Sequence, residues 1–140
     1  MLRVVLDTDV VVAGVRSPSG ASAEILRLAR HGHIDLAVSV PLVLEYEAVV
    51  TRPEHLAASG LDLKNAQAVI DVLVSIADWV RIDYRWRPQT RDPADEMVLE
   101  AAINAKADAI VTFNRRDFGA APEKFGIGCW LPGETLEKLR

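Results

Sequence analysis

Short apolar runs alternate along this sequence with longer segments in which apolar residues recur at helical spacing. The first run, Leu2–Leu6, ends at an aspartate and is typical of a buried strand. Farther on, the segment Ala21–Arg30 brings Ile25, Leu26 and Ala29 to one face of a helix. The change from one spacing to the other predicts a strand followed by a helix.

The same two patterns recur to the end of the chain. The other predicted strands are Ile34–Val38, Trp79–Ile82, Ala109–Val111 and Ile127–Trp130. The other predicted helices are Pro41–Val50 with Ser39 as its N-cap, Glu54–Ser59, Leu63–Asp78, Asp92–Lys106 and Pro132–Leu139, with a loop or short helical turn over Thr112–Gly119. Strands that alternate with helices predict an α/β fold in which helices cover a parallel sheet.

Composition favours a compact globular protein. The chain has 140 residues, of which 50% are hydrophobic and 26% charged, and we expect a single domain over residues 1–140. Its one cysteine, Cys129, can form neither an internal disulfide nor a two-cysteine metal site. The longest apolar stretch, Ile34–Leu44, is too short to cross a bilayer, and the N-terminal residues show no signal-peptide pattern. We therefore expect a cytoplasmic protein without a membrane span.

Acidic residues outnumber basic ones, 20 to 16, which argues against a protein that coats nucleic acid by bulk attraction. Several of them follow predicted strands, at the edge where parallel sheets bind ligands. Carboxylates gathered there repel one another unless a cation lies between them, and Mg²⁺ or Mn²⁺ takes such oxygen ligands. These acids are Asp7 after the first strand, Asp117 after the fourth, Asp92 and Asp95 at the start of the helix before the fourth, and Glu45 in the helix after the second.

Each of these acids also has a structural explanation. Asp7 can cap a turn or helix after the first strand, with Thr8 and Asp9 shaping that turn. Asp92 precedes a proline, which is the pattern of an N-cap and first helical residue. Asp117 can be an exposed turn residue. A metal site and a set of caps therefore both remain open.

Helical spacing separates some of these alternatives. Asp95 shares a helix face with Val98 and Leu99, so it is the first residue of the face that we expect to be buried. A carboxylate there needs a partner such as an ion. Glu45 and Glu47 both have apolar neighbours at helical spacing. Periodicity therefore does not choose between these two glutamates.

A basic and aromatic segment before Asp92 is a second candidate site. Arginines bind phosphates and aromatic rings stack on unpaired bases, which is the combination that single-stranded nucleic acid requires. A solvated loop, with its rings packed into the core or against a second subunit, is the alternative. The residues are Arg81, Tyr84, Arg85, Trp86, Arg87 and Arg91, and Arg115 and Arg116 beside Asp117 are open to the same two interpretations.

Histidine and tryptophan favour structural interpretations. His31, His33 and His55 are too scattered for a zinc site, and we expect them on the surface. Trp79 and Trp130 each lie in an apolar run, and we expect both in the core.

Four segments resemble, in order and spacing, the motifs of the PIN-domain family, and together they span nearly the whole chain. They are Val4–Val12 for the first motif, Ser39 with Glu45 for the second, Arg91–Asp95 with Leu99 and Ala102 for the third, and Ile110–Phe118 for the fourth. The loop Ser17–Gly20 and the segment Leu131–Glu134 resemble the branch of VapC-type toxin components of toxin–antitoxin pairs. Asp9 stands where the family usually has Asn, and Asn114 stands where relatives of this branch often have Asp.

The resemblance implies a three-layer α/β/α fold with a central parallel sheet of about five strands. It also implies a metal-dependent endoribonuclease that uses Mg²⁺ or Mn²⁺ to hydrolyse RNA and leaves 5′-phosphate and 3′-hydroxyl ends. By resemblance the catalytic acids are Asp7, Glu45, Asp95 and Asp117, and the metal ligands are Asp7, Asp92, Asp95 and Asp117. The supporting polar residues are then Thr8, Asp9, Thr112 and Asn114.

Partners also follow from the resemblance, which implies an RNA substrate, a homodimer and a small antitoxin protein that inserts an arginine into the acidic site. Two other functions stay open. The segment Leu6–Val11 resembles the nucleophile motif of haloacid-dehalogenase-like phosphatases, in which Asp7 would be phosphorylated. The second alternative is a PIN-like module that binds RNA or protein without catalysis.

Overall fold

A five-stranded parallel sheet forms the centre of the protein in the computed structural model, which describes residues 1–83, 90 and 92–139. The strands are β1 (Arg3–Leu6), β2 (Asp35–Val38), β3 (Asp78–Trp79), β4 (Ala109–Val111) and β5 (Gly128–Trp130). Their order across the sheet is β3-β2-β1-β4-β5, and every neighbouring pair is parallel. The predicted α/β class and the five parallel strands are confirmed.

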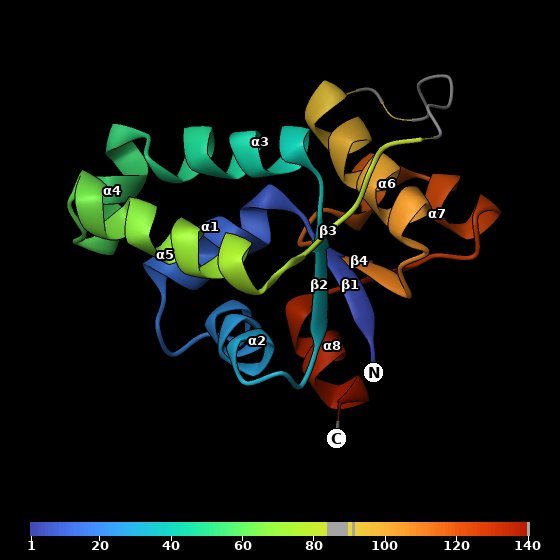
Figure 1. Ribbon diagram of the computed structural model, residues 1–140, viewed down its shortest axis with the longest axis horizontal. Helices are drawn as coiled ribbons and strands as arrows, with labels where there is room; N and C mark the ends of the chain where they lie inside the picture. The colour runs from blue at the N-terminus through green and yellow to red at the C-terminus, as the bar shows by residue number, and fades with distance from the viewer. Residues whose placement is uncertain (84–89, 91, 140) are drawn as a thin grey trace.

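Helices cover both faces of this sheet. They are α1 (Thr8–Arg16), α2 (Ala21–Arg30), α3 (Val40–Val50), α4 (Pro53–Ser59), α5 (Leu63–Ile76), α6 (Pro93–Ala105), α7 (Ala121–Lys124) and α8 (Pro132–Lys138), with a 3₁₀ turn, η1, at Arg115–Phe118. Figure 1 shows α1 to α5 on one side of the strands and α6 and α7 on the other, which confirms the three-layer α/β/α arrangement. Among the described residues, no helix is long and apolar enough to cross a membrane.

Strand β1 lies in the middle of the sheet and is covered on both faces. Val4 and Val5 are fully buried and Leu6 is nearly so, as expected for a parallel strand with helices on either side. Tyr46 and Phe118 are among the largest fully buried side chains around it. The carboxyl end of β1 is therefore held firmly, and the residue that follows it, Asp7, has a fixed position.

The sequence analysis leaves a turn or helix open after Asp7 and does not predict the extent of α1, and the one-turn helix α7 is absent from it. The middle of α1 is the run Val10–Val12, and such β-branched residues are typical of strands. All three valines are buried, because α1 packs against α2 and α3, and this packing outweighs the local preference. At Gly14 the helices come so close that an added Cβ would lie 2.6 Å from Cδ1 of Leu26.

The environment of Trp79 differs from the prediction. Its side chain was expected in the core, yet it is 47% exposed. The reason is that β3 is shorter than the predicted strand and lies at an edge of the sheet, where one side faces solvent. The indole N–H donates to the Val74 carbonyl at 3.1 Å. Trp130, also expected in the core, is partly buried against it, with the Lys138 ammonium 4.7 Å from its ring centroid.

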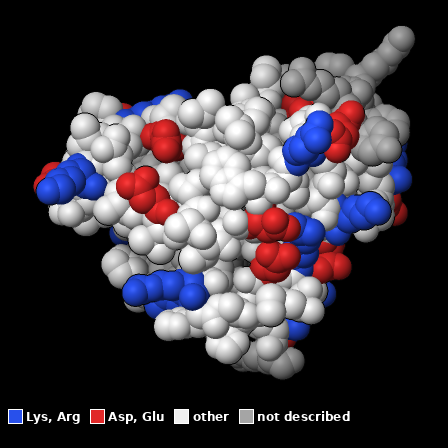
Figure 2. Space-filling view, viewed as in Figure 1, with Lys and Arg blue, Asp and Glu red and all other residues white. Residues whose placement is uncertain are grey.

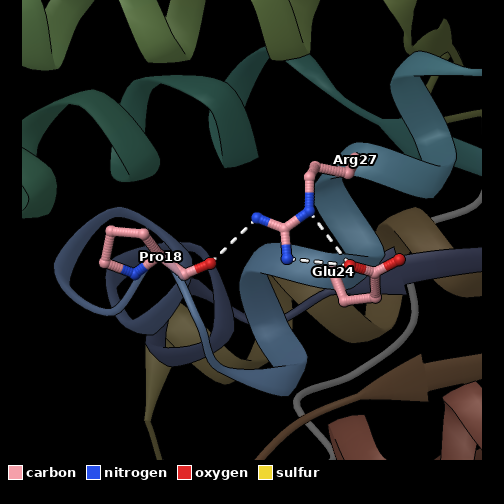
Figure 3. A network of polar contacts seen from close by, with 3 residues as sticks. All are labelled: Pro18, Glu24 and Arg27. Carbon is pink, nitrogen blue, oxygen red and sulfur yellow. Dashed lines mark hydrogen bonds and ion pairs between the residues drawn. The ribbon is translucent and has the colours of Figure 1, made fainter.

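The loop between α1 and α2 is fixed by one arginine. Arg27 donates to the Pro18 carbonyl at 2.9 Å and to the Glu24 carboxylate at 3.0 and 2.8 Å (Figure 3). The predicted loop Ser17–Gly20 is thereby held against the first turns of α2. The guanidinium of Arg27 is consequently engaged within the fold.

The face of the molecule that carries α3, α5 and β3 is mostly white in Figure 2, with separate groups of charged side chains, among them acidic side chains with a basic one near the centre of the view. Helix α5 contributes the exposed Val72 and Ile76. At the beginnings of the strands, Arg3 of β1 pairs with Asp35 of β2 at 3.4 Å and also with Asp78 of β3. This ion-pair group ties three neighbouring strands together at the end of the sheet remote from Asp7.

Candidate active site

The candidate site lies where the strand order reverses. From β1 the chain runs outward through β2 to β3, and then returns to form β4 on the other side of β1. In parallel sheets, ligands bind at the carboxyl ends of the strands at such a switch point. The backbone N–H of Asp7 donates to the Val111 carbonyl at 2.9 Å, so the ends of β1 and β4 lie side by side.

Asp7 is the most firmly held of the acids. Its Oδ1 accepts from the Thr8 N–H at 2.8 Å, which makes Asp7 the N-cap of α1, and its Oδ2 accepts from the Thr112 hydroxyl at 2.6 Å. The side chain is buried, and burial raises the pKa of its carboxyl group, as does the charge of Asp117, although both hydrogen bonds oppose this. The cap and the candidate metal ligand are thus the same residue.

Asp9 lies in the first turn of α1 and faces the loop after β4. Its Oδ2 accepts from the Phe113 N–H and from the Asn114 side-chain amide, both at 3.1 Å. Its Oδ1 is buried and has no hydrogen-bond partner among the described residues. Burial and then the charge of Asp7 raise the pKa of Asp9 to about 7. Hydrogen bonds therefore link Asp9, Asn114 and Thr112 to Asp7 in one group.

The acids of α6 and η1 lie near the same strand ends. Asp92 is the N-cap of α6 and accepts from the Ala94 N–H at 2.9 Å, so its capping role is confirmed. Asp95 is partly buried, and burial raises its pKa to about 6, with further contributions from the charges of Asp7, Asp92 and Asp117. Asp117, in η1, is exposed. Because the charges of Asp7, Asp92 and Asp117 all act on Asp95, these four acids share one electrostatic environment.

Glu45 reaches the site from α3, and the residue beside it explains why. The hydroxyl of the fully buried Tyr46 donates to the Leu6 carbonyl at the end of β1. This contact fixes the rotation of α3, so that Glu45 lines the cavity next to Asp7 whereas Glu47 is exposed elsewhere on the helix. Sequence reasoning did not single out Tyr46, although a tyrosine in an apolar helix needs a partner for its hydroxyl when buried.

Two cavities adjoin the acids, and Asp92 belongs to both. The first, of about 640 Å³, is lined by acidic residues, by small apolar residues of α1 and by three basic residues. The second, of about 740 Å³, lies on the side of α6 and η1. The charged residues and the histidine in the wall of the first cavity are Asp7, Asp9, Glu45, Asp92, Arg16, Arg52 and His55. Those in the wall of the second cavity are Asp92, Asp95, Asp117, Arg116 and Lys124.

Two of the three histidines lie on the surface as predicted, and the arginines beside Asp117 have different surroundings. His31 and His33 are exposed as expected, but His55 is partly buried in the wall of the first cavity, because α4 packs against α1. Arg115 is exposed and pairs with Glu134 at 3.1 Å, whereas Arg116 lines the second cavity. The remaining predicted RNA contacts, Arg85, Arg87 and Arg91, lie outside the described residues, as do Tyr84 and Trp86.

The donor set of the site suits a hydrated divalent cation. Within the part of the chain that the structure describes, no three acidic, histidine or cysteine side chains converge closely enough to hold an ion by themselves. Mg²⁺, however, binds proteins through one or two carboxylates and keeps several water ligands. The charge of Asp7 raises the pKa of Asp95, and Asp9 has a buried oxygen without a partner among the described residues, so the site has an excess of negative charge that a cation would offset.

The fold and this group of acids define a PIN domain. A family model described as PIN domain matches residues 3–116, and the chain therefore belongs to the PIN-domain family. Proteins of this family are generally nucleases that depend on divalent metal ions.

A solved structure shares the fold. The crystal structure of VapBC2 from Rickettsia felis bound to a DNA fragment from their promoter contains a chain that matches with a TM-score of 0.58 and 13% sequence identity. The match covers 92% of this chain and 99% of that chain, and at this identity it shows a common fold. No curated protein matches the sequence.

Proposed function

We propose that this PIN domain is an endoribonuclease that uses Mg²⁺ or Mn²⁺ to hydrolyse RNA phosphodiester bonds. The observation that carries the proposal is the meeting of the acids at the switch point of the sheet, where Asp7, Asp9 and Asp95 all have raised pKa values. Such a concentration of carboxylates is typical of a site built for a cation rather than for helix capping alone.

Asp7 and Asp95 would hold the ion, with Asp92 and Asp117 as further ligands or as contacts through water. A bound ion would lower the pKa of its water ligand and offset charge on the phosphate. The Thr112 hydroxyl and the Thr8 N–H keep both oxygens of Asp7 oriented without any rearrangement. No side chain has to act as a nucleophile.

Glu45 has a separate part in the proposed reaction. It lies on α3 in the wall of the first cavity, which Asp92 also lines, and α3 is anchored through Tyr46. A carboxylate there can orient the attacking water and accept its proton. Asp9 and Asn114 support the loop after β4, which carries Thr112.

The biological role that we propose is that of a toxin paired with an antitoxin. The resemblance of the loop and C-terminal segments to VapC-type toxins supports it, and so does the fold shared with a chain of the VapBC2 structure. A small antitoxin protein, a homodimeric state and a cytoplasmic location belong to the same proposal. The phosphatase alternative loses its support, because the chain belongs to the PIN-domain family.

Cleavage of end-labelled, mixed-sequence single-stranded RNA tests the reaction. We expect cutting with Mn²⁺ or Mg²⁺, none with EDTA, and products with 5′-phosphate ends. Asp7→Asn should lower the rate by at least about 100-fold, because one of the ligands of the ion loses its charge. Asp71→Asn, which changes an exposed acid of α5, should cut like the wild type.

Two results would count against the proposal. Equal cutting by wild type and Asp7→Asn would mean that another nuclease is present in the preparation. Binding of RNA by both proteins without any cutting would favour the non-catalytic binding module.

A further inference from the structure

Basic residues lie on both sides of the acidic site. Arg16, at the end of α1, and Arg52 and His55, at the start of α4, line the first cavity together with Asp7 and Asp9. The second cavity has its own pair, Arg116 of η1 and Lys124 of α7. Because Asp92 lines both cavities, the acids separate two basic groups.

Four of these basic residues have no partner in the part of the chain that the structure describes. Within the described residues, the side chains of Arg16, Arg52, Arg116 and Lys124 form no ion pair and no hydrogen bond, and all four are exposed. Other arginines of the chain are engaged, as Arg27 is with Glu24. The unengaged cations around the cavities are therefore free to bind anions.

The position of Arg16 along α1 determines how far its Cα lies from the acids. An α-helix rises 1.5 Å per residue, so Arg16 lies about 10 Å along the axis from Asp9. With this separation, Arg16 can bind a phosphate next to the one that lies over the acids. The same strand must nevertheless approach a protein with an excess of 4 negative charges, so local cations are needed to hold it.

Building on the proposed function, we propose that one RNA strand crosses both cavities and is held by its phosphates on either side of the bond to be cut. Arg16, Arg52 and His55 bind a phosphate on one side. Arg116 and Lys124 bind a phosphate on the other side. The scissile phosphate then lies near Asp92, which both cavities share.

Binding of single-stranded RNA in EDTA tests this path without cleavage. Two double variants remove one basic group each: Arg16→Ala with Arg52→Ala, and Arg116→Ala with Lys124→Ala. The control, Arg30→Ala with Lys64→Ala, removes two exposed cations of α2 and α5 that line neither cavity. We expect each test variant to bind about tenfold more weakly than the control variant.

Salt dependence and kinetics separate phosphate contacts from a general loss of structure. Each test variant should reduce the slope of log affinity against log salt by about 0.7, since each basic group binds one phosphate and one phosphate contact on a single strand contributes about 0.7. With metal present, KM should rise about tenfold while kcat changes by less than about twofold, because a neighbouring phosphate is held equally before and during the reaction.

The outcomes distinguish this inference from the proposed function. If wild type cleaves RNA and the test variants bind with the affinity and salt slope of the control, the path is wrong and the nuclease proposal stands. If kcat falls while the slope stays unchanged, the cations act on the fold or the chemistry, and the path is also wrong. If wild type neither binds nor cleaves RNA, the proposed function fails, and the path fails with it.

Discussion

The carboxyl group of Asp9 occupies a position that favours a neutral side chain. One of its oxygens accepts from the Phe113 N–H and the Asn114 amide, while the other is buried near Asp7 without a partner among the described residues. Burial and the charge of Asp7 raise its pKa to about 7. An asparagine would keep the acceptor and could donate to Asp7, which gives a physical reason for the asparagine that the family usually has at this position.

Asp9→Asn should stabilise the metal-free protein at alkaline pH. The folded-state pKa of about 7 lies above the ordinary value of 3.8, so the folded protein binds a proton at Asp9 more tightly than the unfolded chain does. The contribution of this proton to the free energy of unfolding is fully present below about pH 4 and is lost as the pH rises to about 7. We expect the substitution to raise the free energy of unfolding at pH 8 by roughly 1–2 kcal/mol, after allowance for solvent screening. Urea unfolding in EDTA at pH 5 and pH 8 measures this change.

Asp71→Asn is the control for that experiment, because Asp71 is exposed on α5. It should leave unchanged the difference between the free energies of unfolding at pH 5 and at pH 8. If Asp9→Asn also leaves the difference unchanged, the pH dependence arises from another group, such as Asp7 or Asp95.

At the scale of secondary-structure elements, the orientation of α3 decides which glutamate joins the site. Glu45 and Glu47 have similar apolar neighbours in the sequence. The buried bond from the Tyr46 hydroxyl to the Leu6 carbonyl turns Glu45 toward the cavity. A contact between residues 40 positions apart in the sequence therefore determines which glutamate lines the cavity, which helical periodicity alone does not.

Glu45→Gln should slow RNA cleavage by about 100-fold, as expected for loss of a group that accepts a proton from the attacking water. The matched change Glu47→Gln keeps the same chemistry on the exposed side of the helix and should leave the rate within about twofold. Single-turnover cleavage at saturating Mn²⁺ compares the two. Equal rates for both variants would remove Glu45 from the proposed reaction.

The starts of helices α3 and α6 could be predicted from their capping residues, whereas the extent of α1 could not be predicted. Helices α3 and α6 begin next to Ser39 and Asp92 as predicted, because each cap accepts a hydrogen bond within its own first turn. The extent of α1 was not predicted because its valines become helical through packing on α2 and α3. The bond between Asp7 and Thr112 joins residues 105 positions apart, so motif order could suggest that they meet, but not how.

At the scale of the whole molecule, the acidic site concentrates repulsion at one edge of the sheet. Asp7 caps α1, Asp92 caps α6, and Asp117 lies in η1, so the repelling charges are distributed over three elements from different parts of the chain. An ion that binds these carboxylates would hold the elements together. Metal binding and global stability are therefore expected to be linked.

Mn²⁺ should raise the melting temperature of the wild type, and more so at pH 8 than at pH 5.5. The raised pKa values of Asp7, Asp9 and Asp95 mean that protons compete with the ion at the lower pH. At 100 times its Kd the ion would add about 2.7 kcal/mol to the free energy of unfolding. Thermal unfolding with Mn²⁺ and with EDTA measures the shift. A shift of the same size in Asp7→Asn would show that the ion binds elsewhere.

The brevity of the edge strands affects how this protein behaves at high concentration. In the described residues, β3 has two residues and β5 has three, and these are the outer strands of the sheet. Each edge thus presents few unpaired backbone groups, whereas association of sheets between molecules needs long, regular edges. Copies of the chain that accumulate would have little opportunity to aggregate by strand pairing, even with exposed apolar side chains such as Val72 and Trp79 nearby in the fold.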